Sequence, residues 1–109
     1  MTTDRAGPRD CLLVRQGPIS PEERGVLAAV RRRLEDRGES SATVLLGTAS
    51  YDAEGLASDH GPPGELWLLE EDARGRGIRA GRAMSPVRTV SASELLRALM
   101  SAKRVVQFP

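Results

Sequence analysis

The sequence is poor in cysteine, histidine and aromatic residues. Its 109 residues include one cysteine, one histidine and three aromatic side chains. The single cysteine, Cys11, excludes an internal disulfide and a cysteine-based zinc site. Because Tyr51, Trp67 and Phe108 are the only aromatic residues, the core must consist mainly of Leu, Val and Ala. We expect neither a metal site nor a cofactor.

Long apolar stretches and a strong excess of charge are absent as well. No apolar run approaches the ~20 residues that a membrane-spanning helix needs. The net charge of +1 provides no overall attraction to nucleic acid or to a membrane surface. Residues 1–10, MTTDRAGPRD, lack the apolar core of a signal peptide and are predicted to form a disordered N-terminal segment. We therefore expect a soluble, cytoplasmic protein that contacts neither membranes nor nucleic acid directly.

Four short apolar runs indicate β-strands at residues 11–16, 42–48, 65–70 and 104–108, and a weaker candidate lies at 86–90. The runs are almost continuous in Leu and Val rather than alternating, which is typical of strands buried on both faces in a parallel sheet. A chain of this length can bury the core of one domain without disulfides or metal. That domain is predicted to comprise residues 11–109.

The segment after the first run carries the signals of an amphipathic helix. Ser20 and Glu23 form the pattern of a capping box, Pro21 suits the first helical position, and Gly38 suits the residue just beyond the end. The expected apolar face comprises Val26, Leu27, Val30 and Leu34. Arg31 is expected to lie outside that face.

Ser91 and Glu94 repeat the capping-box pattern before the last helix. The face that this helix is expected to bury comprises Leu95, Leu96, Leu99 and Met100. Residues 70–77, EEDARGRG, allow only a short helix, because each glycine costs about 1 kcal/mol relative to alanine. Residues 49–64 are predicted to be a loop with one helical turn around residues 52–57.

The alternation of strands and helices predicts an α/β fold: a single doubly wound domain with a four- or five-stranded, mainly parallel sheet and helices on both faces. Ligands bind such sheets beyond the carboxyl ends of the strands. The residues expected at that edge are Gln16–Ser20, Thr48–Tyr51, Glu70–Arg76 and Ser91. The expected core comprises Leu12, Val14, Val26, Leu27, Val30, Leu34, Val44, Leu46, Leu66, Leu68, Leu95, Leu99, Val105 and Phe108.

Cys11 and His60 are the residues from which nucleophilic catalysis would have to be built. Cys11 begins the first strand, at the end opposite the ligand-binding edge, where a small buried hydrophobe is the simpler interpretation. His60 lies in the loop DHGPPG, and no nucleophile elbow accompanies it. Neither a P-loop nor a GxGxxG motif follows the first strand. The sequence therefore assigns no catalytic residue with a recognised motif.

Five arginines within fifteen residues form a dense basic segment: Arg74, Arg76, Arg79, Arg82 and Arg88. In one interpretation they clamp an anion or an acidic partner. In the other they are solvated and balanced by the acidic residues 70–72. We expect Asp72 to cap the short helix at the ligand-binding edge, with Arg74 and Arg76 projecting outward. Leu66, Leu68 and Ile78 around this segment are expected to be buried.

The order of these segments resembles the DsrE/DsrF/DsrH superfamily of small sulfur-relay proteins, most closely its DsrH/TusB branch. The resemblance rests on CLLVRQ, PEERGVLAAVRRRLEDRG, VLLGTASYDA, ELWLLEEDARGRGI, VRTVSASELLRALM and RVVQF. It covers residues 11–108, which is nearly the whole chain.

The resemblance implies a compact domain that works in a homo- or hetero-oligomer, with itself or with related DsrE/DsrF-like chains. Family complexes pass persulfide sulfur between cysteines, as in tRNA thiolation or sulfur oxidation. The sulfur-carrying members place a reactive cysteine near the end of the third strand, whereas residues 69–77 contain none here. The resemblance therefore implies a non-catalytic DsrH/TusB-like subunit that acts through protein–protein contacts.

Two alternatives stay open. In the first, the chain is a sulfur carrier whose persulfide acceptor is Cys11. In the second, a small anion binds at the carboxyl edge of the sheet, at residues 48–51 and the helical turn that follows. Taken together, the candidate binding residues are Thr48, Ser50, Tyr51, Asp72, Arg74 and Arg76.

Overall fold

A computed structural model describes residues 9–53, 56, 65–77 and 87–108. Five strands form one sheet in the order β4-β3-β2-β1-β5. They are β1 (Cys11–Gln16), β2 (Ser41–Leu46), β3 (Glu65–Leu69), β4 (Val87–Val90) and β5 (Arg104–Gln107). Every neighbouring pair of strands is parallel. The predicted α/β fold is confirmed, and the weak strand candidate at 86–90 is a member of the sheet.

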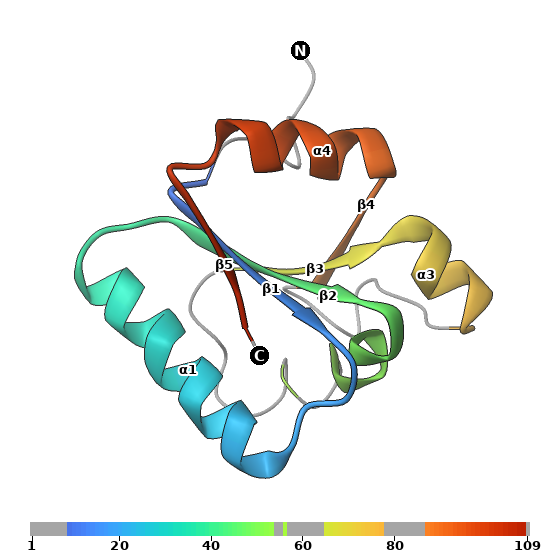
Figure 1. The fold of residues 1–109 in the computed structure, drawn as a ribbon, viewed down its shortest axis with the longest axis horizontal. Helices are drawn as coiled ribbons and strands as arrows, with labels where there is room; N and C mark the ends of the chain where they lie inside the picture. The colour runs from blue at the N-terminus through green and yellow to red at the C-terminus, as the bar shows by residue number, and fades with distance from the viewer. Residues whose placement is uncertain (1–8, 54–55, 57–64, 78–86, 109) are drawn as a thin grey trace.

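Helices lie on both sides of the sheet (Figure 1). The long helix α1 (Pro21–Asp36) covers one side, and α4 (Ala92–Ser101) crosses the other side from β4 to β5. The 3₁₀-helix η1 (Gly47–Asp52) follows β2, and the short helix α3 (Glu70–Gly75) follows β3. None of the described helices has the length and apolar character needed to cross a membrane.

Both predicted capping boxes are present. The Ser20 hydroxyl accepts a hydrogen bond from the Glu23 amide, and the Glu23 carboxylate accepts one from the Ser20 amide. Ser91 and Glu94 exchange the same two bonds at the start of α4. Each box satisfies amides that the first helical turn leaves without an intrahelical partner. Beyond α1, Gly38 has a φ of 75°, the left-handed conformation that glycine adopts without strain.

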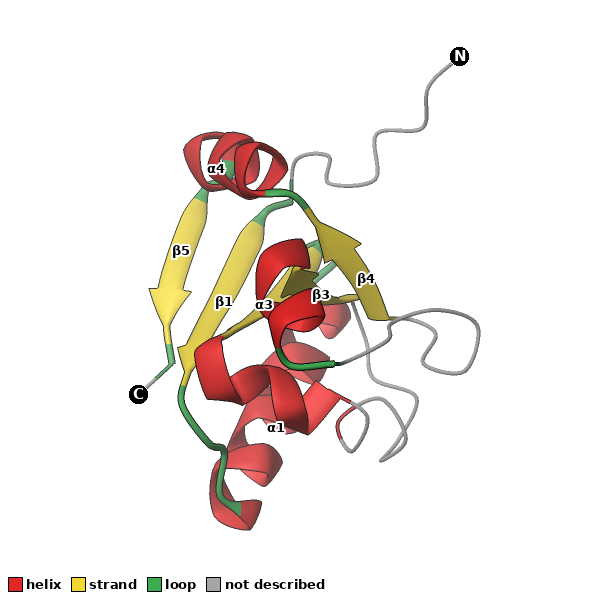
Figure 2. Ribbon diagram, turned by 90° about the vertical axis from the view of Figure 1, so that its right-hand side faces the viewer, coloured by secondary structure: helices red, strands yellow, loops and turns green. Residues whose placement is uncertain are grey.

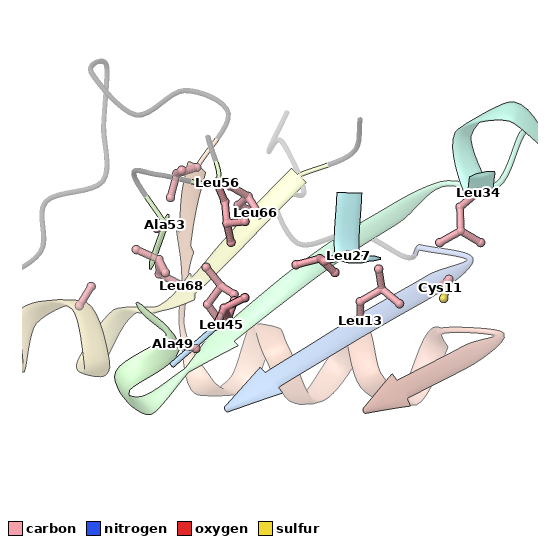
Figure 3. Close-up of a cluster of buried hydrophobic side chains, with 13 residues drawn as sticks. Cys11, Leu13, Leu27, Leu34, Leu45, Ala49, Ala53, Leu56, Leu66 and Leu68 are labelled. Carbon is pink, nitrogen blue, oxygen red and sulfur yellow. The ribbon is translucent and has the colours of Figure 1, made fainter. Parts of the chain in front are cut away.

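Two apolar layers enclose the sheet because successive side chains of each strand point to opposite faces. The α1 layer comprises Cys11, Leu13, Ile19, Leu27, Leu34, Leu45, Ala49, Ala53, Leu56, Leu66, Leu68, Ala73 and Val87 (Figure 3). The α4 layer comprises Leu12, Ala42, Val44, Trp67, Val90, Leu95 and Ala98. Trp67, on β3, is fully buried and is the largest such side chain, so the one tryptophan belongs to the α4 layer.

Some apolar residues that were expected to be buried are exposed. Val26 is 55% exposed because it lies on the outer side of α1, next to the buried Leu27. Val105 is 47% exposed because β5 is the edge strand of the described sheet. Leu96 and Met100 are exposed on the outer side of α4, whereas Leu95 is buried. The predicted core residues that are only partly buried are Val14, Val30, Leu46, Leu99 and Phe108.

Arg31 is buried, which contradicts its expected place outside the apolar face of α1. Only 2% of its surface is exposed, and its Nε and Nη2 atoms have no hydrogen-bond partner among the described residues. Arg31 lies one turn from both Leu27 and Leu34, so the stripe that faces the sheet runs through positions 27, 31 and 34. Burial lowers the pKa of Arg31 to about 10. The prediction was wrong because it followed the charge of Arg31 rather than its helical spacing from Leu27 and Leu34.

Several predictions fall on parts of the chain outside the described residues. They concern His60, Ile78, Arg79, Arg82 and residues 1–8 of the expected N-terminal segment. Asp10, at the end of that segment, is described. Its amide donates to the Ser40 hydroxyl and its carboxylate accepts from the Ser40 amide, each at 2.9 Å. The bond from the Ser40 amide lowers the pKa of Asp10.

Candidate functional site

The carboxyl ends of β1, β2 and β3 meet at one edge of the sheet because the three strands are parallel and adjacent. We call this the carboxyl edge and define it as residues 16–20, 47–52 and 70–76, which begin at or directly after the ends of the three strands. Figure 1 shows β2 running into η1 and β3 running into α3 there. The fold thus gathers the three segments from which ligand-binding residues were predicted.

Gly47 is the residue through which η1 and α3 are joined. Its amide donates to Asp72 Oδ2 at 2.9 Å, and its carbonyl accepts from Arg76 Nε at 3.0 Å. The Arg76 guanidinium also lies over the Tyr51 ring, 5.6 Å from its centroid, within the range of a cation–π interaction. Gly47 has a φ of 58°, a left-handed conformation that suits glycine. One acid and one arginine therefore hold the backbone amide and the backbone carbonyl of a single residue.

This arrangement corrects two expectations about α3. Asp72 does not cap the helix: Leu69 occupies the N-cap position, without a side-chain cap, and the Asp72 carboxylate reaches across to η1. Arg76 does not project outward, because its side chain is held by Gly47 and Tyr51. The expected burial of Leu66 and Leu68 is confirmed.

The remaining candidate residues divide into an outer and an inner group. Thr48 and Tyr51 are exposed, and Arg74 is exposed beside Glu70, with 3.8 Å between Nη2 and Oε2. Ser50 is buried, and its hydroxyl donates to the Leu45 carbonyl at 3.4 Å. The structure thus brings Tyr51, Asp72 and Arg76 together, leaves Thr48 and Arg74 facing outward, and turns Ser50 into the fold.

Arg15 contributes a second contact network at the carboxyl edge that the sequence reasoning missed. Its guanidinium donates to both Glu23 oxygens, at 3.0 and 3.1 Å, and also to the Pro18 carbonyl. Asp52 Oδ2 accepts from the Ile19 amide at 3.2 Å. Hydrogen bonding by the Ser20 amide and the charge of Arg15 lower the pKa of Glu23. The signal available in the sequence was an arginine inside the apolar run CLLVRQ, where a buried charge requires a partner.

Cys11 lies at the opposite end of the molecule from the carboxyl edge. It begins β1, pairs with Ser41 and Arg104 on the neighbouring strands, and is 1% exposed in the α1 layer. Burial raises the pKa of the Cys11 thiol, as do Glu39 and Asp10, and these effects outweigh the positive charge of Arg104. A thiol with a raised pKa and no exposed surface is a poor nucleophile at neutral pH.

The described residues were also compared with what a metal site or an anion site requires. They include no group of three or more His, Cys, Asp or Glu side chains able to hold a metal ion. At the carboxyl edge, the Gly47 amide already donates to a carboxylate, that of Asp72. An external anion at this position would have to displace Asp72.

The fold is similar to that of the ychN protein from E. coli. Its crystal structure gives a TM-score of 0.67, and the likeness covers 92% of this chain and 99% of that chain. The two sequences are 17% identical, so the likeness shows a shared fold. No family model matches the sequence, and no curated protein matches it.

Proposed function

We propose that this chain is a DsrH/TusB-like subunit of a sulfur-relay assembly and that it contributes contacts rather than a transferable thiol. The position of its single cysteine is the observation that carries the proposal. Cys11 is buried at the amino end of the sheet, and no other cysteine exists in the chain. Sulfur transfer needs an accessible thiolate. In this proposal the sulfur is therefore carried by a related DsrE/DsrF-like partner.

The fold supports the general assignment. The ychN protein has a DsrE/DsrF-like fold, and this chain matches nearly all of it. The sequence resemblance to the same superfamily is independent of that comparison because it rests on the motifs along the chain. The setting that the resemblance implies is cytoplasmic sulfur transfer, as in tRNA thiolation or sulfur oxidation.

The contact surface that we assign to the partner is the outer part of the carboxyl edge. Thr48, Tyr51 and Arg74 are exposed there, and Tyr51 is 58% exposed. The network of Gly47, Asp72 and Arg76 holds these residues on a fixed frame. Tyrosine and arginine are among the residue types enriched where binding energy is concentrated in protein interfaces.

Arg74→Glu tests this surface. Exposed charges contribute little to folding, so the melting temperature should remain nearly unchanged. A reversed charge in an interface impairs association, so co-purification with a co-expressed DsrE/DsrF-like chain should fall. Arg97→Glu, an exposed arginine on α4, is the matched control and should retain the partner. Unchanged co-purification by Arg74→Glu would remove α3 from the interface.

A second experiment separates the subunit role from the sulfur-carrier alternative. The purified chain is incubated with a cysteine desulfurase and isotopically labelled cysteine, and its intact mass is measured. We expect no gain of a sulfur atom on this chain, and a gain on a thiol-bearing partner in the same mixture. A gain on this chain that disappears in Cys11→Ser would establish the carrier role instead.

A further inference from the structure

Strand β5 lies at one edge of the described sheet. All four of its residues are exposed, and two of them are apolar: Val105 is 47% exposed and Val106 is 43% exposed. The opposite edge differs, because Val87 and Val90 of β4 are buried. Figure 2 shows β5 at the outer border of the sheet, with no described helix along its outer side. Such an edge is a template for a further strand.

The hydrogen bonds to β1 determine which groups of β5 face outward. The Arg104 amide donates to the Asp10 carbonyl at 3.0 Å, and the Phe108 amide donates to the Val14 carbonyl at 2.7 Å. In a parallel ladder the residues that bond to the neighbour alternate, so Val106 faces β1 in the same way. The amides and carbonyls of Val105 and Gln107 therefore point to the open side.

We propose that β5 pairs antiparallel with β5 of a second copy of this chain, about a twofold axis at Val106. In this register Val105 of one copy lies opposite Gln107 of the other. The two residues exchange an amide-to-carbonyl hydrogen bond in each direction, and the twofold repeats the exchange. All four outward amides and carbonyls of each strand are then used, so that two five-stranded sheets become one continuous sheet.

The side chains of β5 suit this register. Val106 meets Val106 of the second copy as a directly opposed pair without backbone hydrogen bonds, in which side chains approach most closely. No like charges oppose each other, since Arg104 lies opposite Phe108 and its guanidinium is paired with Glu39 within its own chain. The segment from Val105 to Gln107 also lacks the lysine, proline or bulge that usually blocks edge pairing.

A second copy is favoured over an unrelated peptide because the side chains of β5 also suit one another in this register, with Val106 opposite Val106 and Arg104 opposite Phe108 rather than another arginine. Two identical strands related by a twofold axis bring each outward amide to an outward carbonyl with no adjustment of register. The pairing goes beyond the proposed function and uses a different surface. The pairing is tested on the purified chain alone. If it fails, the co-purification experiment at Arg74 is unaffected, and failure of that experiment likewise leaves the pairing of β5 untouched.

Sedimentation equilibrium of the purified chain over a wide concentration range tests the pairing. We expect a monomer–dimer equilibrium. Val106→Lys places two like charges directly across the axis and should raise the dimer Kd by ~100-fold or more. Val105→Pro removes an outward amide that the monomer does not use and should also abolish dimerisation, because proline is tolerated on an edge strand when its missing amide faces outward.

Val26→Lys, which replaces another exposed valine, on α1, is the matched control and should leave the dimer intact. Hydrogen exchange gives an independent readout: the Val105 and Gln107 amides should become protected as the concentration rises. A monomer at all concentrations, or a dimer that survives both β5 substitutions, overturns the proposal. So does dimer formation without protection of these two amides, because another surface would then be responsible. Val106→Lys keeps the test decisive if Val105→Pro does not fold.

Discussion

At the scale of single residues, Leu45 and Leu46 illustrate how position on a strand determines stability. They are neighbours on β2, but Leu45 is fully buried in the α1 layer, whereas Leu46 only borders the α4 layer. Leu45→Ala should lower the free energy of unfolding by about 2–5 kcal/mol, the range for a large-to-small change in a packed core. Leu46→Ala, at a position that the sequence predicted to lie in the core, should cost less. Urea denaturation of both variants measures the difference, and equal costs would contradict the assigned register.

Arg31 offers the opposite case, a buried side chain whose replacement should stabilise the fold. Its guanidinium is desolvated, and within the part of the chain that the structure describes its Nε and Nη2 atoms have no hydrogen-bond partner. Replacing buried charge by an apolar side chain of similar volume is often stabilising by ~1–4 kcal/mol. We expect Arg31→Met to raise the midpoint of urea unfolding. Arg32→Met, at the neighbouring exposed position, should have little effect, and a destabilised Arg31→Met would reveal a partner for the guanidinium.

Glu65 should make the free energy of unfolding depend on pH. Its carboxylate accepts hydrogen bonds from Trp67 Nε1 and Arg9 at 2.8 Å each and from Arg88 at 3.0 Å. Burial raises the pKa of Glu65, but these hydrogen bonds and the charges of Arg9 and Arg88 outweigh it, so the pKa lies below its ordinary value of 4.5. The folded state therefore binds the proton less tightly than the unfolded chain does. The resulting stabilisation is present above pH 4.5 and is lost as the pH falls through the folded pKa.

Glu65→Gln tests that sign. At neutral pH the variant should be less stable by about 1–3 kcal/mol, because it loses charge-assisted hydrogen bonds. The difference from the wild type should shrink as the pH falls below 4.5. Thermal unfolding of both proteins across the acidic range measures it. A difference that stays constant with pH would mean that the carboxylate contributes through shape rather than through its charge.

At the scale of elements, the capping box of α4 gives a direct test of what begins a helix. The Ser91 hydroxyl accepts a hydrogen bond from the Glu94 amide at 3.1 Å, and replacing Ser91 by alanine leaves that amide without its partner. Ser91→Ala should therefore cost roughly 1 kcal/mol in the free energy of unfolding. Ser91→Asp retains a side-chain acceptor at the same position and should be nearly as stable as the wild type. Equal losses in both variants would assign the effect to packing rather than to capping.

Elements that are determined by residues close together in the sequence could be predicted. Contacts between elements that are distant in the sequence could not. Both helix starts follow from a serine and a glutamate three residues apart, which satisfy each other's amides. The exposure of Val105 depends on β5 being an edge strand, which its apolar sequence does not reveal. Likewise, the bond from Arg76 to Gly47 joins residues 29 positions apart, so inspection of EEDARGRG alone suggested an outward arginine.

At the scale of the whole molecule, the alternation of strands and helices was sufficient to predict a parallel sheet, but not its order. The chain adds β2, β3 and β4 successively on one side of β1 and then returns through α4 to place β5 on the other side. That return depends on the path of α4 across one side of the assembled sheet, which the order of strands and helices in the sequence does not determine. The candidate site followed from topology in the same partial way: its edge was predictable, but the pairing of Asp72 and Arg76 with Gly47 was not.

The adjacency of β1 and β5 also determines how the protein should respond to a pulling force. The two strands are parallel, so a force applied near Asp10 and near Phe108 slides them past each other and loads the bonds of their ladder together. A force applied near Asp10 and Lys103, at the same end of the pair, would instead open those bonds one at a time. Single-molecule stretching should therefore record a higher unfolding force in the first geometry. The ladder between β1 and β5 would therefore act as a mechanical clamp when the two ends of the domain are pulled apart.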